Sequence, residues 1–373
     1  MAYGLKQMHV AIVGGGISGL AAAWALTREG CRVTLFEQGP IPNPLSASGD
    51  EHRIIRRAYG SADGYAFRIS EAFEAWDELW RDLGTSHFAP TGILAVSLEA
   101  GDGTDVYRDG LDRTGFAYEL LRPQEAAERY PFLDAAAIRY AFFTAEGGVL
   151  FSQRIARNLR AWLSTNGVDL REHTKVVAID TEAGRVETAS GDAVVADRIV
   201  VTAGAWTPGF FPDLAASLRA YRTAVAYLEP PAELKSAWEK APAILDVGGK
   251  VDGYVLPPVD GTGLKVGAGI VKRPSPPDID RDPAPGEGEK IRDLFAPPFA
   301  RIAEYGVAGV ATCAYTFTAD ERFFATARGK ALIVSACSGH GYKFGAAIGR
   351  RIAEAAISGD VARFEAWLAA ERR

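Results

Sequence analysis

The sequence predicts an α/β nucleotide-binding domain of the Rossmann βαβ type, combined with an α+β domain built on a mixed or antiparallel sheet. Residues 9–38 read as a strand, a glycine turn, an alanine-rich helix and a second strand. Residues 330–359 repeat the order strand, glycine turn and helix near the other end of the chain. Between these units lie stretches rich in strand signals and proline, and 373 residues leave room for two domains.

The composition is that of an ordinary globular protein, with 48% hydrophobic and 24% charged residues. The net charge of -6 gives no reason to expect nucleic acid or an anionic membrane surface as a partner. No apolar run approaches the roughly 18 residues that a membrane span needs. Three widely spaced cysteines, Cys31, Cys313 and Cys337, match neither a disulfide framework nor a metal pattern, so we expect no metal and a reducing, cytoplasmic compartment.

The order of these signals predicts that the nucleotide-binding domain is discontinuous. We expect it to comprise residues 1–85, 147–217 and 319–373, and the second domain to comprise residues 86–146 and 218–318. Within the first segment, apolar side chains at helical spacing predict an amphipathic helix over residues 66–83 that ends at Gly84. In the second domain, residues 272–289 read KRPSPPDIDRDPAPGEGE and are expected to be too polar to pack.

The first glycine turn has the spacing and the context of a dinucleotide site, because it follows a strand and opens a helix. Gly14 permits the tight turn, Gly16 lets the backbone approach a pyrophosphate, and Gly19 lets helix and strand pack closely. The helix N-terminus offers N–H groups to the phosphates. Glu37, at the end of the second strand, can accept a hydrogen bond from a ribose hydroxyl and would repel the 2′-phosphate of NADP. This unit leaves FAD and NAD open.

The second glycine turn, SGHGYKFG at residues 338–345, favours a flavin. A typical NAD dehydrogenase holds its cofactor with the N-terminal unit, so it gives no reason for a second turn of this kind. A second helix N-terminus could stabilise the negative charge that develops near N1 of a flavin as it is reduced.

Five blocks in the same order then resemble the monomeric sarcosine oxidase family, which belongs to the D-amino-acid-oxidase-like flavoproteins and includes N-methyltryptophan and pipecolate oxidases. They are GGGISGL, GDEHRIIRRAYG, GLKVG, CAYTFTADERFF and SGHGYKFG, spread over nearly the whole chain. The resemblance implies FAD in a glutathione-reductase-like domain covered by the mixed-sheet domain. It also implies oxidation of the C–N bond of a secondary amino acid, N-methyl or cyclic, to an imine, with O2 reduced to H2O2.

The resemblance also assigns cofactor contacts. Cys313 matches the family cysteine that carries FAD through a thioether to the 8α position, although without the family it would be taken for a buried core thiol. The full set of expected cofactor residues is Gly14, Gly16, Ile17, Ser18, Gly19, Glu37, Gln38, Arg53, Val176, Gly204, Trp206, Cys313, Gly339, Gly341 and Lys343.

Six residues are expected in catalysis. Arg56 and Lys343 match the pair that binds the substrate carboxylate, and a guanidinium suits a carboxylate because its fork is planar and permanently charged. Lys265 matches the lysine that assists oxygen reduction, although a lysine on a strand more often projects to solvent. The resemblance places Arg53 close to the flavin and Tyr254 and Tyr315 near the substrate; on pattern alone, the arginines could be surface residues and the tyrosines core residues.

Two departures from the family pattern leave the substrate open. His52 replaces a threonine before the first arginine, and Gly269 stands where a histidine is common; both positions lie on the substrate side in the family. Alternatives are an FAD-dependent amino-acid dehydrogenase, a glycine or primary amino-acid oxidase, and a flavin-bearing subunit of a larger assembly. We expect a monomer or homodimer.

Overall fold

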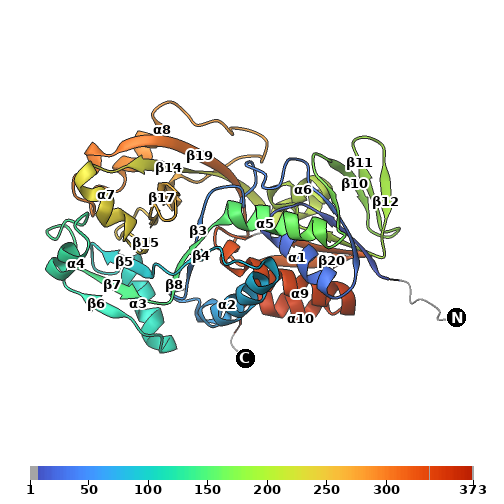
Figure 1. Cartoon of the computed structure of the whole chain (residues 1–373), viewed down its shortest axis with the longest axis horizontal. Helices are drawn as coiled ribbons and strands as arrows, with labels where there is room; N and C mark the ends of the chain where they lie inside the picture. Colours follow the sequence, from blue (N-terminus) through green and yellow to red (C-terminus); the bar gives the residue numbers. More distant parts are fainter. Residues whose placement is uncertain (1–6, 336, 372–373) are drawn as a thin grey trace.

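The computed structural model describes residues 7–335 and 337–371 of the chain. Within them, the strands form a six-stranded sheet, a nine-stranded sheet and two small three-stranded sheets. Figure 1 shows the two large sheets in two lobes that lie side by side, with the nine-stranded sheet in the left-hand lobe. The expected ends of the nucleotide-binding domain at residues 1–6 and 372–373 lie outside the described residues.

The six-stranded sheet is mainly parallel, with the strand order β20-β21-β13-β1-β2-β9. Strand β20 runs antiparallel to β21, and the other neighbours are parallel. Its central strand β1 is buried on both faces because helices cover the sheet. The strands are β1 (His9–Val13), β2 (Arg32–Phe36), β9 (Asp169–Arg171), β13 (Arg198–Val201), β20 (Phe324–Arg328) and β21 (Ala331–Ser335).

The helices beside this sheet form one continuous apolar core. Helix α1 packs against both α9 and α5, and α2 packs against α9. These helices are α1 (Ile17–Arg28), α2 (Asp63–Leu83), α5 (Ser152–Thr165), α9 (Gly345–Ser358) and α10 (Val361–Leu368). The helix predicted over 66–83 is thus confirmed as α2, and Gly84 ends it with a left-handed φ of 70°.

The nine-stranded sheet is largely antiparallel and has its own core. Its long strands β14 (Arg219–Glu229) and β19 (Gly306–Phe317) pair over their full length and reach from this sheet toward the six-stranded one. The other strands are β5 (Ile93–Ser97), β6 (Glu119–Leu121), β7 (Tyr140–Thr144), β15 (Ala243–Asp246), β16 (Gly253–Leu256), β17 (Leu264–Ala268) and β18 (Arg273–Pro274).

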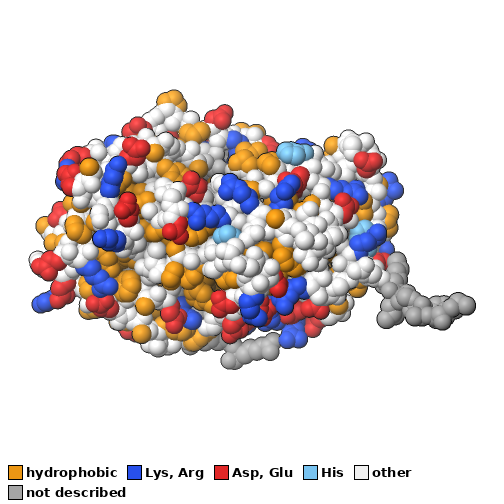
Figure 2. Space-filling model, viewed as in Figure 1, with side chains coloured by type: hydrophobic (Ala, Val, Ile, Leu, Met, Phe, Trp, Pro, Cys, Tyr) orange, Lys and Arg blue, Asp and Glu red, His pale blue; other side chains and the backbone are white. Residues whose placement is uncertain are grey.

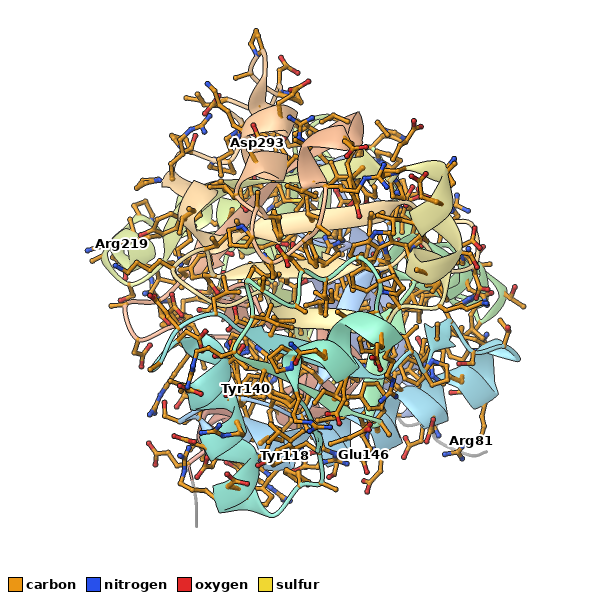
Figure 3. The ribbon with its side chains drawn as sticks, turned by 90° about the vertical axis from the view of Figure 1, so that its left-hand side faces the viewer. Arg81, Tyr118, Tyr140, Glu146, Arg219 and Asp293 are labelled. Atoms are coloured by element: carbon orange, nitrogen blue, oxygen red, sulfur yellow. The ribbon has the colours of Figure 1, made fainter. Side chains whose placement is uncertain are left out.

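Among the described residues, the lobe that contains the nine-stranded sheet also has four α-helices. They are α3 (Gly103–Thr114), α4 (Pro123–Arg129), α7 (Ala232–Glu239) and α8 (Glu287–Asp293). Figure 3 views the lobe end-on, with Asp293 of α8 near the top and Tyr140 of β7 and Tyr118 toward the bottom.

The chain also forms the two small three-stranded sheets. One contains β10 (Val176–Asp180), β11 (Arg185–Thr188) and β12 (Ala193–Val195), and the other contains β3 (Arg53–Arg56), β8 (Gly147–Leu150) and β4 (Phe88–Ala89). Arg53 and Arg56 therefore lie on a strand, at the two ends of β3. Pairing of β3 with β8 holds both arginines in a fixed backbone register.

Most of the polar segment 272–289 is exposed, as the sequence predicts, but buried contacts anchor it at a few points. Arg222 of β14 is 1% exposed and forms a two-pronged ion pair with Glu287, at 2.7 Å for Nη2 to Oε2, and its Nε donates to the carbonyl of Asp280. A buried arginine from a neighbouring strand thus anchors the segment, which composition could not show.

The molecular surface carries acidic and basic side chains interspersed over the face seen in Figure 2. None of the helices in the described parts of the chain is long and apolar enough to cross a membrane.

Candidate functional site

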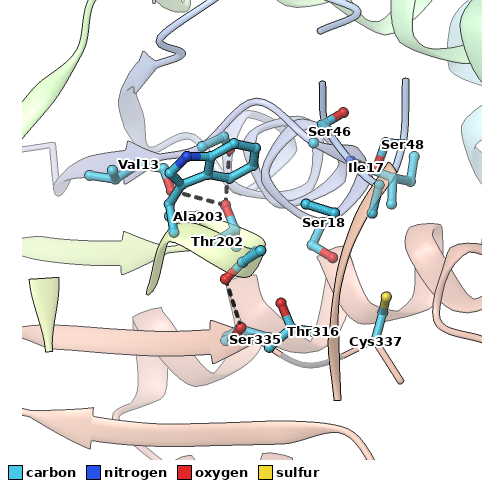
Figure 4. A pocket seen from close by; sticks show the side chains of 18 of the residues that line it. Val13, Ile17, Ser18, Ser46, Ser48, Thr202, Ala203, Thr316, Ser335 and Cys337 are labelled. Atoms are coloured by element: carbon cyan, nitrogen blue, oxygen red, sulfur yellow. Dashed lines mark hydrogen bonds between the residues drawn. The ribbon is translucent and has the colours of Figure 1, made fainter. Parts of the chain in front are cut away.

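A cavity of about 450 Å³ opens at the carboxyl ends of the parallel strands β1, β13 and β21. This is the edge at which open α/β sheets bind their ligands. Figure 4 shows Ser18 of α1, Thr202 after β13 and Ser335 of β21 around it. Twelve of the predicted cofactor residues line the cavity: Gly14, Gly16, Ile17, Ser18, Glu37, Gln38, Arg53, Val176, Gly204, Trp206, Gly339 and Gly341.

The glycines of the first turn have different tasks. Gly14 has a φ of +108°, and a Cβ there would lie 2.6 Å from the carbonyl oxygen of Thr202. A Cβ on Gly19 would lie 1.9 Å from the carbonyl oxygen of Gly14, so Gly19 permits close packing of α1 and does not line the cavity. Gly16 is open on the cavity side, where a Cβ would approach only Ser48 Oγ, at 3.4 Å.

Glu37 is held rigidly at the end of β2. Its Oε2 accepts a hydrogen bond from the backbone N–H of Gly15 at 2.8 Å, and its Oε1 accepts from the N–H of Gly39 and from Asn43 Nδ2, both at 2.9 Å. The carboxylate is buried yet lines the cavity, and its remaining lone pairs leave acceptor capacity for a ligand hydroxyl.

The loop after β2 contributes residues that the sequence reasoning missed. Asn43, Ser46, Ala47 and Ser48 all line the cavity, and Ser48 Oγ accepts the N–H of Ile17 at 3.0 Å, the first of α1. An asparagine and serines shortly after the second strand of a βαβ unit are a signal for such a capping loop.

The second glycine turn meets the cavity from the other side. Gly339, with a φ of +75°, and Gly341 line it together with Tyr342. Cys337 also lines it and is half-buried, so it is not a core thiol. The turn carries it past the end of β21 to the cavity, where Figure 4 shows its sulfur.

Beside the cavity lies a buried charge cluster. Lys265 Nζ donates to Asp50 Oδ2 at 2.8 Å, and Arg53 Nη1 donates to the same oxygen at 3.0 Å. Tyr227 donates its hydroxyl to the other oxygen of Asp50. Lys265 is 1% exposed although it is on strand β17, so the solvent-facing alternative for this lysine is wrong.

The cluster shifts the pKa values of its members. Burial lowers the pKa of Lys265 to about 8, in spite of the opposing effect of Asp50. Burial alone would raise the pKa of Asp50, but Lys265 and Arg53 together hold it well below its usual range. Lysine and aspartate are therefore both charged near neutral pH.

His52 lies against this cluster with both ring nitrogens buried and without a hydrogen-bond partner in the described chain. Its ring stacks near Tyr227, with 6.4 Å between centroids. Burial and the charge of Lys265 lower the pKa of His52 well below its usual value, so the ring is neutral.

Arg56 and Lys343 lie around the ring of Tyr59. The Arg56 guanidinium carbon is 4.4 Å from the ring centroid, and Lys343 Nζ is 5.5 Å from it. Both donate to backbone carbonyls, of Ala58 and His340, and neither forms an ion pair within residues 7–335 and 337–371. Lys343 is 3% exposed, and burial and Arg56 lower its pKa well below its usual value. Neither cation lines the 450 Å³ cavity.

The two predicted tyrosines lie near Arg53, with which both interact electrostatically. Tyr315 lines the cavity, whereas Tyr254 does not; a Cβ on Gly267 would lie 2.6 Å from the Tyr254 ring. Gly267 of β17 therefore provides the space for the ring of Tyr254, which lies on the neighbouring strand β16.

Cys313 is 4% exposed and lies opposite Thr223 across the pair β14 and β19. It does not line the cavity, although Ala314, which follows it, does. Burial raises the pKa of its thiol, while Arg53, Lys265 and Arg281 act to lower it.

Asp278 is a site residue that the sequence reasoning missed, because its segment was expected not to pack; Arg281 of the same segment does not line the cavity. Asp278 lines the cavity and accepts Trp206 Nε1 at 2.8 Å. Arg281 Nη2 donates to the carbonyl of Leu45 at 2.6 Å, while Nε and Nη1 are buried with no partner among the described residues.

These features fit a bound dinucleotide. The cavity has a helix N-terminus and glycine turns for phosphates, and Glu37 for a ribose.

Comparisons with known proteins agree with this geometry. The family model described as FAD dependent oxidoreductase (DAO) matches residues 9–355. Monomeric sarcosine oxidase of Bacillus sp. (strain B-0618) is 27% identical over 365 residues, covering 95% of this chain and 93% of the relative. N-methyl-L-tryptophan oxidase of Yersinia pestis (strain Pestoides F) is 24% identical over 350 residues, covering 91% and 92%.

Solved structures share the fold. L-proline dehydrogenase from P. horikoshii superposes with a TM-score of 0.80 at 19% identity and covers 95% of this chain and 94% of its own. NikD, an unusual amino acid oxidase, gives a TM-score of 0.80 at 19% identity, with 96% and 97% covered.

Proposed function

This chain belongs to the DAO family of FAD-dependent oxidoreductases, and we propose that it oxidises the C–N bond of a secondary amino acid to an imine and passes the electrons to O2, forming H2O2. The proposal is supported by the sarcosine and N-methyltryptophan oxidases among its relatives. The residues described above would hold FAD, which supplies a two-electron acceptor for the hydride.

The observation that carries the proposal is the pair of cations around Tyr59. Arg56 and Lys343 approach one ring and repel each other, and neither forms an ion pair with an acid in the described structure. A buried lysine without a counter-charge is destabilised, and a ligand carboxylate would relieve both the burial and the repulsion. We propose that this pair binds the carboxylate of the amino acid.

The main contribution of this cation pair to the reaction would be to position the substrate. The pair fixes the substrate at its carboxylate, so that the C–H bond next to nitrogen is presented in one orientation, and orientation lowers the barrier by several kcal/mol. The amine must lose its proton before hydride leaves, because an ammonium has no lone pair to stabilise the iminium. Lys265 would stabilise negative charge as oxygen is reduced. Water then hydrolyses the released imine.

The two-lobed division is part of the proposal. We propose that residues 1–85, 147–217 and 319–373 bind FAD and that 86–146 and 218–318 cover the substrate, in a cytoplasmic monomer or homodimer. In support, each strand of the six-stranded sheet comes from the first set and each strand of the nine-stranded sheet from the second.

The direct test is a peroxide assay with the purified chain and N-methyl, cyclic and primary amino acids. Peroxide formed with N-methyl amino acids, proline or pipecolate supports the oxidase. Flavin bleaching without peroxide indicates a dehydrogenase, activity restricted to primary amines indicates a glycine-oxidase-like enzyme, and no flavin reduction by any amino acid alone indicates a subunit of a larger assembly.

We further propose that Cys313 forms a thioether to FAD. Acid precipitation of the wild-type protein is then expected to leave the yellow colour in the pellet, and mass spectrometry to find FAD on the Cys313 peptide. Cys313→Ser should release the flavin to the supernatant, because its hydroxyl cannot provide the thiolate nucleophile. Cys337→Ser, which alters a cysteine that lines the cavity, is the matched control and should retain the colour. Loss of all colour from the wild type would refute the tether.

The pH dependence of the oxygen step should report Lys265. Its lowered pKa of about 8 means that the ammonium is present below that pH and is lost as the pH rises through it. We expect the rate at which oxygen reoxidises the enzyme to fall between about pH 7 and 9, well below the ordinary lysine range. Stopped-flow measurement in Lys265→Met should show this step without the decline; an unchanged profile in that variant would exclude the role.

A further inference from the structure

Asp252 is an acid that the proposed reaction does not use, held at the rim of the same lobe as Tyr254. Its side chain reaches solvent. Its backbone has a φ of +49°, a left-handed conformation that aspartate and asparagine tolerate better than most residues. The backbone oxygen accepts the N–H of Gly269 at 2.8 Å, which fixes the turn before β16. Within the described residues its carboxylate has no hydrogen-bond or ion-pair partner.

Gly269 makes the space for this carboxylate. A Cβ on Gly269 would lie 1.8 Å from Asp252 Oδ2, far inside any van der Waals contact. The backbone of Gly269 is not in the left-handed region, so conformation alone does not demand glycine there. The Asp252 carboxylate can therefore occupy its position only because residue 269 has no side chain.

Electrostatic interactions link Asp252 to Arg56 of the cation pair. Lys272, Glu321 and Arg56 all interact with its carboxyl electrostatically, and burial among these surroundings raises its pKa above the usual range. Tyr107, Tyr254 and Asp246 are the other titratable groups that interact with it electrostatically. Solvent reaches the side chain, although protein atoms also lie close around it.

The balance of charges around Asp252 changes when a carboxylate binds to Arg56. Glu321 already pairs with Lys272, at 3.2 Å between Oε1 and Nζ. In the free protein the remaining charges, Arg56 and Asp252, are opposite in sign. Once a substrate carboxylate neutralises Arg56, Asp252 is left as an acid with no cation of its own, which favours a positive group on the bound molecule.

We propose that Asp252, in the space left by Gly269, is a specificity determinant that selects amino acids whose side chain ends in a cationic group. The inference rests on the proposed function, because it needs the carboxylate at Arg56 and Lys343. The substrate class is an N-alkyl basic amino acid, such as an N-methylated lysine or arginine. Its carboxylate lies at the cations and its distal ammonium or guanidinium at Asp252.

A matched substrate pair tests the proposal. For the wild type, kcat/KM should be about tenfold higher with Nα-methyl-lysine than with Nα-methyl-norleucine, which lacks the distal ammonium. Asp252→Asn keeps the left-handed backbone but removes the charge, and it should abolish this preference by raising KM for the basic substrate while kcat changes little. Asp260→Asn, another exposed aspartate with a positive φ, is the control and should retain the preference.

A second variant tests the geometry without removing the charge. Gly269→Ala places a methyl group on the Asp252 carboxylate, so it should also reduce the preference, and combining it with Asp252→Asn should add nothing further. Equal kcat/KM for the two substrates in the wild type, or an equal loss for both in Asp252→Asn, would overturn the proposal.

Binding gives an answer that does not depend on turnover. 6-Aminohexanoate should raise the midpoint of thermal unfolding more than hexanoate does in the wild type, and by the same amount as hexanoate in Asp252→Asn. Equal shifts in the wild type would refute the role of Asp252. If no secondary amino acid reduces the flavin but the two carboxylates still shift the unfolding midpoint by different amounts, the proposed reaction is refuted and the role of Asp252 in binding a cation is retained.

Discussion

Replacement of Arg56 by glutamine is expected to lower kcat/KM for an N-methyl amino acid by about 100- to 1,000-fold. Truncating one member of a desolvated charge pair typically loses 2–5 kcal/mol, and each 1.36 kcal/mol is a factor of ten. Most of the loss should appear in KM, because the carboxylate is bound in both the ground state and the transition state. Steady-state kinetics with saturating oxygen measure the effect.

The neighbouring Arg57 provides a matched control. It also carries a full positive charge, but it pairs with Glu146 and donates to Ser70 at 2.9 Å. Arg57→Gln should leave kcat/KM within about threefold, because it removes a rim ion pair. A benzoate or hexanoate titration should lose affinity in Arg56→Gln and not in Arg57→Gln. Similar kinetics for both variants would show that Arg56 does not bind the carboxylate.

Replacement of Lys265 by methionine is expected to slow the reaction with oxygen by at least about 100-fold, while reduction of the flavin by substrate changes by less than about tenfold. The asymmetry follows from where charge develops. The substrate amine is neutral when hydride leaves it. Oxygen, in contrast, gains negative charge in a site where Lys265 is a buried cation. Separate stopped-flow measurements of the two half-reactions, anaerobic and aerobic, give the comparison. Equal slowing of both would remove the proposed role.

The same substitution also tests the buried ion pair. Lys265→Met leaves Asp50 at 6% exposure with Arg53 and Tyr227 as remaining partners, so the free energy of unfolding should fall by up to about 3–5 kcal/mol. The double variant Asp50→Asn, Lys265→Met removes the stranded charge. It should recover part of the stability in urea unfolding and none of the oxygen reaction, which separates folding from chemistry.

Local patterns allowed much of the cofactor side to be predicted. The strand, turn and helix around Gly14 and Gly16 are adjacent in sequence, so their geometry follows from local rules, and twelve predicted residues line the cavity. Gly19 was expected in the site for packing, and packing is what the structure shows. The loop residues Ser46 and Ser48 were missed because a polar loop gives no periodic signal.

The Rossmann-type α/β domain, the flavoprotein family and the candidate cations can all be predicted from the amino-acid sequence, because they depend on local spacing and on ordered motifs. Which charges are paired depends on the tertiary fold. Lys265 meets Asp50 from 215 residues away, whereas Arg56 and Lys343 lie around one ring without an ion pair to an acid. The tertiary structure also shows that Arg222 anchors the exposed segment 272–289 through Glu287 and that Asp252 occupies the space beside Gly269. Burial and pairing depend on which distant segments come together, and no local pattern encodes that.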